Sequence, residues 1–239
     1  MLTINNISIG YGDRTLIANA SASIAKGRLV ALLGRNGAGK SSLLRVLAGI
    51  DKPLFGSVCV AGDEVAAMTA NLKARKVAFV TTQRVRIANL RCRDVVAMGR
   101  APYTDWIGSL SPNDSEIVDQ SLSLVGMQDY AGRTMDKMSD GECQRIMIAR
   151  ALAQDTPIIL LDEPTSFLDL PNRYEVGILL QKLAHEKEKT VVFSTHELDI
   201  ATSLCDDIAL INPPSLSLDT AKATVDSGIL SKIFSIPKL

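Results

Sequence analysis

The stretch Gly34-Arg35-Asn36-Gly37-Ala38-Gly39-Lys40-Ser41 decides how the rest of this 239-residue chain is interpreted. It matches the pattern GxxxxGK[ST] at every fixed position. Its glycines allow a tight turn in which successive N–H groups point inward, and such a turn binds phosphate oxygens. The pattern therefore predicts a site for nucleotide phosphates. The predicted contacts are Gly34, Asn36, Gly37, Ala38, Gly39, Lys40, Ser41 and Ser42.

The residues on either side of this loop support the interpretation, which matters because a bare match can occur by chance. Residues 29–33 form a continuous apolar run, which is typical of a strand buried on both faces of a parallel sheet. Residues 41–47 have helical character, and the positive end of that helix dipole would attract phosphate. Lys40 then supplies a charge to the β- and γ-phosphates, and the Ser41 hydroxyl can ligate Mg²⁺.

The remaining apolar pattern predicts an α/β core with a helical lobe inserted into it. Residues 77–80, 158–161 and 191–194 are short apolar runs that we interpret as further buried strands. Between them, from about residue 87 to 155, apolar residues recur at helical spacing instead.

The two ends of the chain give weaker signals. Leu2 to Ile9 alternates as a strand does, and Tyr11-Gly12-Asp13 has the composition of a turn. Pro213-Pro214 is expected to end the sheet, because the tail that follows is weakly patterned. We expect a single domain over residues 1–239, divided into a nucleotide-binding core (1–86 and 156–212), a helical subdomain (87–155) and a C-terminal tail (213–239).

Polar residues follow two of the predicted strands at the point where each strand ends. Asp162 and Glu163 come directly after an apolar run, and His196 follows another. Ligands collect at the carboxyl ends of strands in open α/β sheets, so we expect these side chains beside the phosphate loop. Asp162 is the candidate Mg²⁺ ligand, and Glu163 is the candidate general base that polarises a water molecule in line with the γ-phosphate. His185 lies in a polar run and is expected to be a solvated helix end.

The segment Met138-Ser139-Asp140-Gly141-Glu142 precedes a predicted helix and contains a second candidate anion site. Ser139 and Glu142 have the S-x-x-E spacing of a capping box. The free N–H groups of such a helix end bind anions readily, although the same pattern is also compatible with a helix cap alone.

Together these motifs resemble those of ABC ATPases over residues 1 to 212, in the same order along the chain. Residues 138–142 resemble the signature motif, commonly LSGGQ. The resemblance implies a P-loop NTPase (RecA-like) α/β core with an N-terminal antiparallel β subdomain and an inserted α-helical signature subdomain. It also implies that Tyr11 stacks on adenine, that Gln83 is the Q-loop glutamine with a catalytic and Mg²⁺-binding role, that residues 166–169 form the D-loop and that His196 is the catalytic switch histidine.

The mechanism that the resemblance implies needs two copies of the chain. Each copy would present Ser139, Gly141 and Glu142 to the ATP that is bound, with Mg²⁺, by Lys40 and the phosphate loop of the other. Two transmembrane permease subunits, and indirectly a substrate-binding protein, would complete a transporter, with this chain at the cytoplasmic face of the inner membrane. Asp140 and Glu142 depart from the usual signature residues and add negative charge, which would weaken attraction for phosphate unless both side chains turn away.

A further stretch resembles ATPases of iron-siderophore, haem and cobalamin importers. Gly99-Arg100-Ala101-Pro102-Tyr103 resembles a motif of those proteins, and with Trp106 it offers rigid apolar anchors for a membrane subunit. Two alternatives remain open, an exporter or lipoprotein-release ATPase and a soluble ABC ATPase of the iron–sulfur assembly type.

Composition excludes other classes of protein. The 26 basic and 26 acidic residues cancel, so no bulk charge favours nucleic acid as a partner. No apolar run approaches the roughly 18 to 20 residues that would span a bilayer, and the N-terminus does not resemble a signal peptide. We therefore expect a soluble protein of the cytosol.

Overall fold

The computed structural model describes residues 1–12, 14–82, 88–166 and 168–235, and its strands form two sheets. The six-stranded sheet has the order β10-β9-β3-β8-β7-β6, and the four-stranded sheet has the order β2-β1-β4-β5. The strands are β1 (Leu2–Tyr11), β2 (Arg14–Ile24), β3 (Leu29–Gly34), β4 (Phe55–Val60), β5 (Asp63–Glu64), β6 (Val77–Val80), β7 (Ile158–Asp162), β8 (Thr190–Ser194), β9 (Asp207–Asn212) and β10 (Ser215–Thr220).

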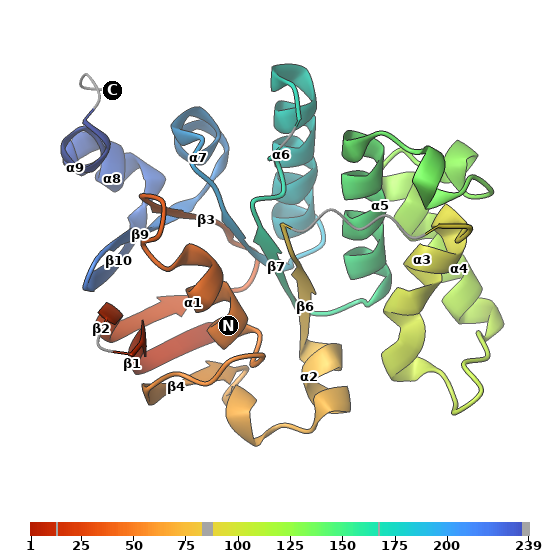
Figure 1. The fold of residues 1–239 in the computed structure, drawn as a ribbon, viewed down its shortest axis with the longest axis horizontal. Coiled ribbons are helices and arrows are strands. Elements are labelled where there is room, and N and C mark those ends of the chain that lie inside the picture. Colours follow the sequence, from red (N-terminus) through yellow and green to blue (C-terminus); the bar gives the residue numbers. More distant parts are fainter. Residues whose placement is uncertain (13, 83–87, 167, 236–239) are drawn as a thin grey trace.

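Helices cover the larger sheet and build a separate lobe (Figure 1). The α-helices are α1 (Lys40–Leu47), α2 (Ala70–Lys76), α3 (Cys92–Ala97), α4 (Pro112–Leu124), α5 (Asp140–Ala153), α6 (Leu170–His185), α7 (Leu198–Leu204), α8 (Ala221–Asp226) and α9 (Ile229–Phe234). Short 3-10 helices are η1 (Val65–Ala67), η2 (Met98–Tyr103), η3 (Gln128–Tyr130) and η4 (Met135–Lys137).

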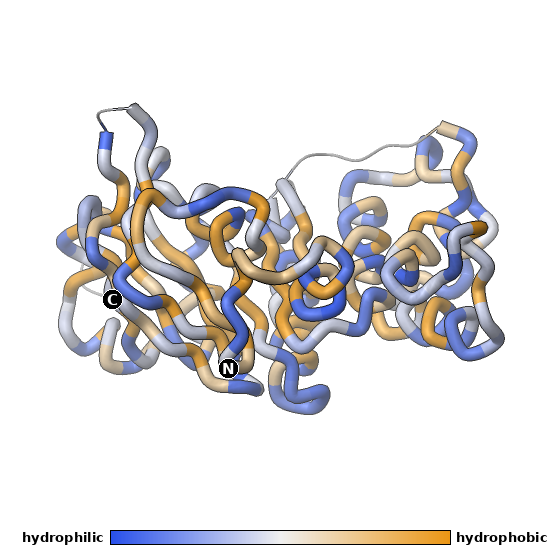
Figure 2. The backbone as a smooth tube through the Cα atoms, turned by 90° about the horizontal axis from the view of Figure 1, so that it is seen from below, coloured by the Kyte–Doolittle hydropathy of each residue, from blue (hydrophilic) through white to orange (hydrophobic). Residues whose placement is uncertain are grey.

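The larger sheet confirms the predicted α/β fold. Strands β6, β7, β8, β3 and β9 pair in parallel, and every residue of β3, β7 and β8 is buried. Their apolar residues are continuous because both faces of the sheet are covered. Figure 2 shows the same distribution, with hydrophobic segments along the strands and hydrophilic segments at outer turns. The predicted strands at 29–33, 77–80, 158–161 and 191–194 are all present.

The prediction that Pro213-Pro214 ends the sheet is wrong. β10 follows these prolines directly and pairs antiparallel with β9 from Ser215–Asn212 to Thr220–Asp207. Leu216 and Leu218 pack against the core on one face of β10, while the serines beside them lie on the other face. This alternation extends over only a few residues, which explains why the sequence pattern is weak.

The smaller sheet is an antiparallel layer that packs against α1. β1 pairs with β2 on one side and with β4 on the other. The turn predicted at Tyr11-Gly12 connects β1 to β2, and Asp13 lies outside the described residues. Leu2, Ile7 and Ile17 are fully buried in one cluster with Leu43 and Leu44 of α1. This layer therefore fixes the helix that follows the phosphate loop.

The helical lobe contains α3, α4 and α5 and lies at the far end of the molecule from β1 and β2 (Figure 1). Its centre includes a buried ion pair, because Arg100 Nε donates to Asp114 Oδ1 at 2.8 Å and both side chains are at least 92% covered. Arg100 also donates to the carbonyl of Ala153 at 2.8 Å. The Ser111 hydroxyl and the Arg100 guanidinium hold the pKa of Asp114 below its usual value.

Asp114→Asn is expected to lower the free energy of unfolding by about 3 kcal/mol at neutral pH, because it leaves the buried Arg100 charge without its partner. Urea denaturation measures this loss. The matched control is Asp119→Asn, which removes an exposed partner of Arg93 and should cost at most about 1 kcal/mol. The depressed pKa means that Asp114 stabilises the fold above its unfolded pKa of about 4. The difference between variant and wild type should therefore shrink as pH falls below about 4, and a difference independent of pH would contradict the assignment.

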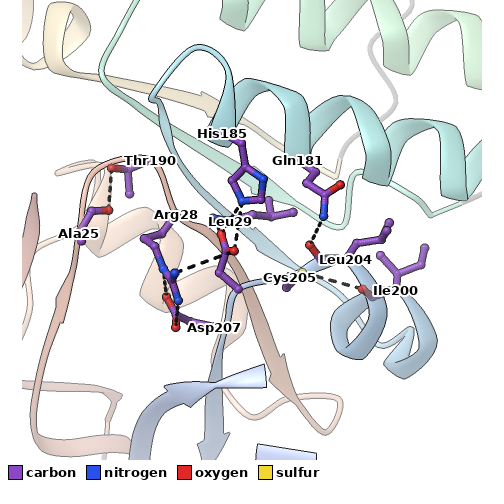
Figure 3. Close-up of polar contacts among 11 residues, drawn as sticks. Ala25, Arg28, Leu29, Gln181, His185, Thr190, Ile200, Leu204, Cys205 and Asp207 are labelled. Carbon is purple, nitrogen blue, oxygen red and sulfur yellow. Dashed lines mark hydrogen bonds and ion pairs between the residues drawn. The ribbon is translucent and has the colours of Figure 1, made fainter. Parts of the chain in front are cut away.

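The amino-terminal ends of β3 and β9 are joined by a polar cluster (Figure 3). Arg28 forms two hydrogen bonds with Asp207, at 2.6 and 2.8 Å, and Asp206 accepts from the N–H of Leu29 at 2.8 Å. His185, the last residue of α6, places Nε2 3.0 Å from Asp206 Oδ2. His185 was expected to be a solvated helix end, and it is the exposed last residue of α6, where it also contacts Asp206. The cluster closes the end of the sheet opposite the phosphate loop.

Candidate nucleotide site

The phosphate loop lies between β3 and α1, as its sequence predicts. Gly37 and Gly39 have φ angles of +74° and +105°, which residues with a β-carbon rarely adopt. A β-carbon at Gly34 would lie 2.9 Å from the carbonyl oxygen of Ile211, so this position also requires glycine. Lys40 is 7% exposed and its Nζ donates to the Gly34 carbonyl at 2.9 Å. The ammonium is thus held against the loop.

A pocket of about 570 Å³ opens beside this loop. That volume is suitable for a ligand of nucleotide size. The pocket combines loop residues with the side chains that follow β7 and β8. Its lining residues are Leu16, Asn36, Gly37, Gly39, Lys40, Ser41, Ser42, Glu163 and His196.

The end of β7 is held in place by β8. Ser194 donates its hydroxyl to Asp162 Oδ1 at 2.6 Å, and the N–H of Glu163 donates to Ser194 Oγ at 2.8 Å. Asp162 is 7% exposed. Glu163 has a φ angle of +49°, a strained conformation for a residue other than glycine and one that clusters at functional sites. Sequence analysis did not identify Ser194, although a hydroxyl at the end of an apolar strand is a visible signal.

Glu163 and His196 lie next to each other at the pocket. His196 Nδ1 is 3.9 Å from Glu163 Oε1, which is too long for a direct hydrogen bond. Their side chains are 28% and 56% exposed, so water reaches both. A carboxylate in this position can accept a proton from water, and the imidazole can contact a phosphate oxygen.

Three residues of the antiparallel layer border the loop. Tyr11 is exposed, and its hydroxyl donates to Ser42 Oγ at 3.2 Å. Arg14 donates to the carbonyl of Gly37 at 3.3 Å. Leu16 lines the pocket and contacts the position where a Gly39 side chain would be. The sequence indicated Tyr11 but not Arg14 or Leu16. Gln83, the remaining candidate on this side, lies outside the described residues.

The predicted capping box is present at the start of α5. Glu142 N–H donates to Ser139 Oγ at 3.3 Å, and Ser139 N–H donates to Glu142 Oε2 at 2.7 Å. The bond from the Ser139 N–H holds the pKa of Glu142 below its usual value. The Glu142 carboxylate therefore turns back onto its own helix, as expected. Ser139, Gly141 and Glu142 belong to the lobe and are not among the residues that line the pocket (Figure 1).

The oxygen atoms near the pocket fit a magnesium ion that is bound together with phosphate. Among the described residues, no group of three or more His, Cys, Asp or Glu side chains could hold a metal by itself. Mg²⁺ in nucleotide sites uses one or two protein oxygens together with phosphate oxygens and water. The Ser41 hydroxyl and the Asp162 carboxylate are ligands of this kind.

The fold and the pocket define a P-loop nucleotide hydrolase, in which a glycine-rich loop joins a parallel strand to a helix and carboxylates follow another strand of the same sheet. The family model described as "ABC transporter" matches residues 17–166, more than half of the chain. The chain belongs to the ABC transporter family and is an ATPase of that family.

Two relatives illustrate this similarity. An uncharacterised ABC transporter ATP-binding protein from Methanocaldococcus jannaschii is 41% identical over 211 residues, which cover 88% of this chain and 73% of the relative. The achromobactin transport ATP-binding protein CbrD from Dickeya dadantii is 33% identical over 236 residues, which cover 98% of this chain and 88% of the relative.

Two solved structures share the fold over nearly the whole chain. A metal-chelate type ABC transporter in an inward-facing conformation matches with a TM-score of 0.87 and 30% identity, covering 99% of this chain and 89% of the other. The dimeric ATP-binding cassette MJ0796, bound to ADP and phosphate after hydrolysis, matches with a TM-score of 0.81 and 26% identity, covering 92% and 99%. In the part of the chain that the structure describes, no helix has the length and apolar character needed to cross a membrane.

Proposed function

We propose that this chain is the ATP-hydrolysing subunit of an importer that takes up an iron chelate, haem or cobalamin, and that it acts at the cytoplasmic face of the membrane. The pocket that joins the phosphate loop to Glu163 and His196 is the observation that carries the ATPase role. The import role is supported by the achromobactin transport relative and by the metal-chelate transporter structure.

Within the site, each residue has a chemical task. The N–H groups of the phosphate loop and the Lys40 ammonium bind the β- and γ-phosphates. Ser41 and Asp162 hold Mg²⁺, which neutralises phosphate charge when it is bound. Glu163 accepts a proton from the attacking water, and His196 contacts the γ-phosphate from the end of β8. The ring of Tyr11 offers a face on which adenine can stack.

The signature segment acts in a head-to-tail dimer, because within one chain Ser139 does not line the pocket. The dimeric structure of the MJ0796 cassette supports the formation of a dimer. Ser139 Oγ accepts a hydrogen bond from Glu142 N–H, and its hydroxyl also interacts with the Glu142 carboxylate, so that hydrogen must turn to reach a phosphate oxygen of the other copy. The capping box holds the Glu142 carboxylate on the Ser139 N–H at the start of its own helix.

The membrane subunits dock in a groove between the core and the lobe. This groove of about 330 Å³ is lined by the end of α1 with Gly49 and Ile50, by α2, by β6 and by Gln154 of the lobe. Ile50 is 52% exposed, so it offers apolar surface to a partner in this groove. The occupant that fits is a cytoplasmic helix of a membrane subunit. Such a helix would contact both the lobe and the core, so movement of the lobe against the core would move the helix.

The sequence suggests Pro102, Tyr103 and Trp106 as anchors for a membrane subunit, and two of the three make contacts within the chain. The Tyr103 ring is half-buried, with the Arg100 guanidinium 4.0 Å and the Arg75 guanidinium 4.8 Å from its centre. Pro102 gives its carbonyl to Arg75 at 2.7 and 3.0 Å. These two residues therefore join the lobe to α2, while Trp106, at 93% exposure, remains available for a partner.

Ile50→Glu is expected to reduce co-purification with the membrane subunits at least 10-fold, because a charge replaces an apolar contact worth about 2 kcal/mol. ATP affinity should stay within twofold of wild type. The matched control is Leu124→Glu, on an exposed apolar residue of α4 outside the groove. Pull-down from membranes, with uptake of labelled siderophore, haem and cobalamin in the same cells, measures both steps. Assembly that survives Ile50→Glu would contradict the docking site, and unchanged uptake of all three compounds without this chain would contradict the import role.

A further inference from the structure

The first two turns of α6 connect three parts of the molecule that the proposed function uses separately. α6 lies between α5 and α7 (Figure 1). On one side, Arg145 of the signature helix donates to Asn172 at 3.2 Å and also pairs with Glu175. On the other side, the Tyr174 hydroxyl donates to Asp199 of α7 at 3.0 Å. The start of α6 is thus fixed both to the lobe and to the segment that follows β8.

Arg173 makes a further connection, to Leu168 and to Glu197. Its Nε donates to the carbonyl of Leu168 at 2.6 Å. Its Nη1 lies 3.0 Å from Glu197 Oε1. Glu197 directly follows His196 and is 7% exposed. Its two carboxylate oxygens are closed to solvent, and no described donor forms a well-aligned hydrogen bond with either of them. Arg173 is therefore the charge that compensates this buried carboxylate.

The connection continues from Leu168 to the signature motif. Leu168 is buried, and a β-carbon at Gly141 would lie 3.1 Å from its Cδ2. A contiguous set of contacts therefore runs from Gly141 through Leu168, Arg173 and Glu197 to His196, which is 3.9 Å from Glu163.

From this geometry we infer that Arg173 and Glu197 are positioning residues that couple the two ATP sites of the dimer. The inference rests on the proposed head-to-tail dimer, in which the signature segment of a copy serves its partner's ATP while His196 serves its own. Movement of Gly141 against the partner's nucleotide would shift Leu168, and the Arg173–Glu197 pair would pass that shift to His196. Neither residue contacts ATP, so both act through His196.

The test compares Glu197→Gln, Arg173→Gln and the double variant. Glu197→Gln is nearly isosteric, so it removes the charge with little change of shape and remains informative if Arg173→Gln alone, which leaves a buried charge, does not fold. Each single variant is expected to lower kcat about 10-fold and to bring the Hill coefficient for ATP toward 1, with the Kd for ATP within twofold of wild type. The kcat of the double variant should be no lower than that of the less active single variant, because both residues belong to one pair. Arg93→Gln is the matched control, since Arg93 also pairs with a carboxylate and is 36% exposed against 35% for Arg173.

Two results would overturn the inference, namely a wild-type kcat and Hill coefficient in Glu197→Gln, or losses that multiply in the double variant. ATP-dependent dimerisation is measured in parallel on the wild-type chain. If that chain does not dimerise, the proposed dimer fails. If it dimerises and Glu197→Gln keeps full cooperativity, only the coupling inference fails.

Discussion

Glu163→Gln is expected to lower ATP turnover about 100-fold or more while ATP affinity remains within a few-fold of wild type. Glu163 is the only carboxylate among the residues that line the pocket in the described part of the chain, and the proposed mechanism uses the His196 imidazole beside it for phosphate contact, so Glu163 is the candidate base for the attacking water. The amide of glutamine keeps the shape and can still orient water, but it cannot take the proton. The backbone contacts of residue 163, to Ser194 Oγ and from the Ser166 hydroxyl, do not involve its side chain and should persist.

The measurement is steady-state phosphate release together with equilibrium binding of a fluorescent ATP analogue. Lys40→Ala is the contrasting variant, because it removes the ammonium that binds phosphate and should lose affinity. Glu116→Gln, on the exposed surface of α4, is the matched control and should leave both quantities unchanged. Wild-type turnover in Glu163→Gln would assign the base to another residue.

The second large effect concerns the signature segment. Ser139→Arg and Lys40→Ala are each expected to lose at least about 90% of ATPase activity alone, because each lesion affects both composite sites of a symmetric dimer. An equimolar mixture should regain activity. In a mixed dimer, the intact phosphate loop of one subunit faces the intact Ser139 of the other, and the second site carries both lesions.

Random pairing makes about half of the dimers mixed, so the mixture is expected to reach up to about a quarter of wild-type activity. ATPase assays of each variant and of the mixture measure this recovery. Asp129→Arg, an exposed position of the lobe outside α5, serves as the control for adding a positive charge. A mixture no more active than its components, together with full activity of Ser139→Arg, would mean that the segment is only a helix cap.

The features that the sequence predicted correctly are those encoded within a few residues. The phosphate loop, the apolar strands and the capping box of Ser139 and Glu142 each depend on neighbours in the chain, and all are present. Turn geometry, strand burial and capping are local properties, so a pattern of fewer than ten residues suffices to predict them.

The features that the sequence could not predict depend on residues that are far apart in the chain. Ser194 contacts Asp162 across two neighbouring strands, and Arg173 contacts Glu197 across a helix and a strand. Tyr103 also contacts Arg75 of α2, which precedes it by many residues. Such pairs become visible only when the fold brings them together, since a single sequence contains no information on which distant charges meet.

Sedimentation velocity of the Glu163→Gln protein, with and without ATP, tests whether the pocket and the signature segment form one hydrolytic site only when two copies close on ATP. We expect a monomer without nucleotide and a dimer with ATP. We also expect that Ser139→Arg in the same protein restores the monomer. A Glu163→Gln protein that binds ATP and stays monomeric, or a dimer indifferent to Ser139→Arg, would contradict this expectation.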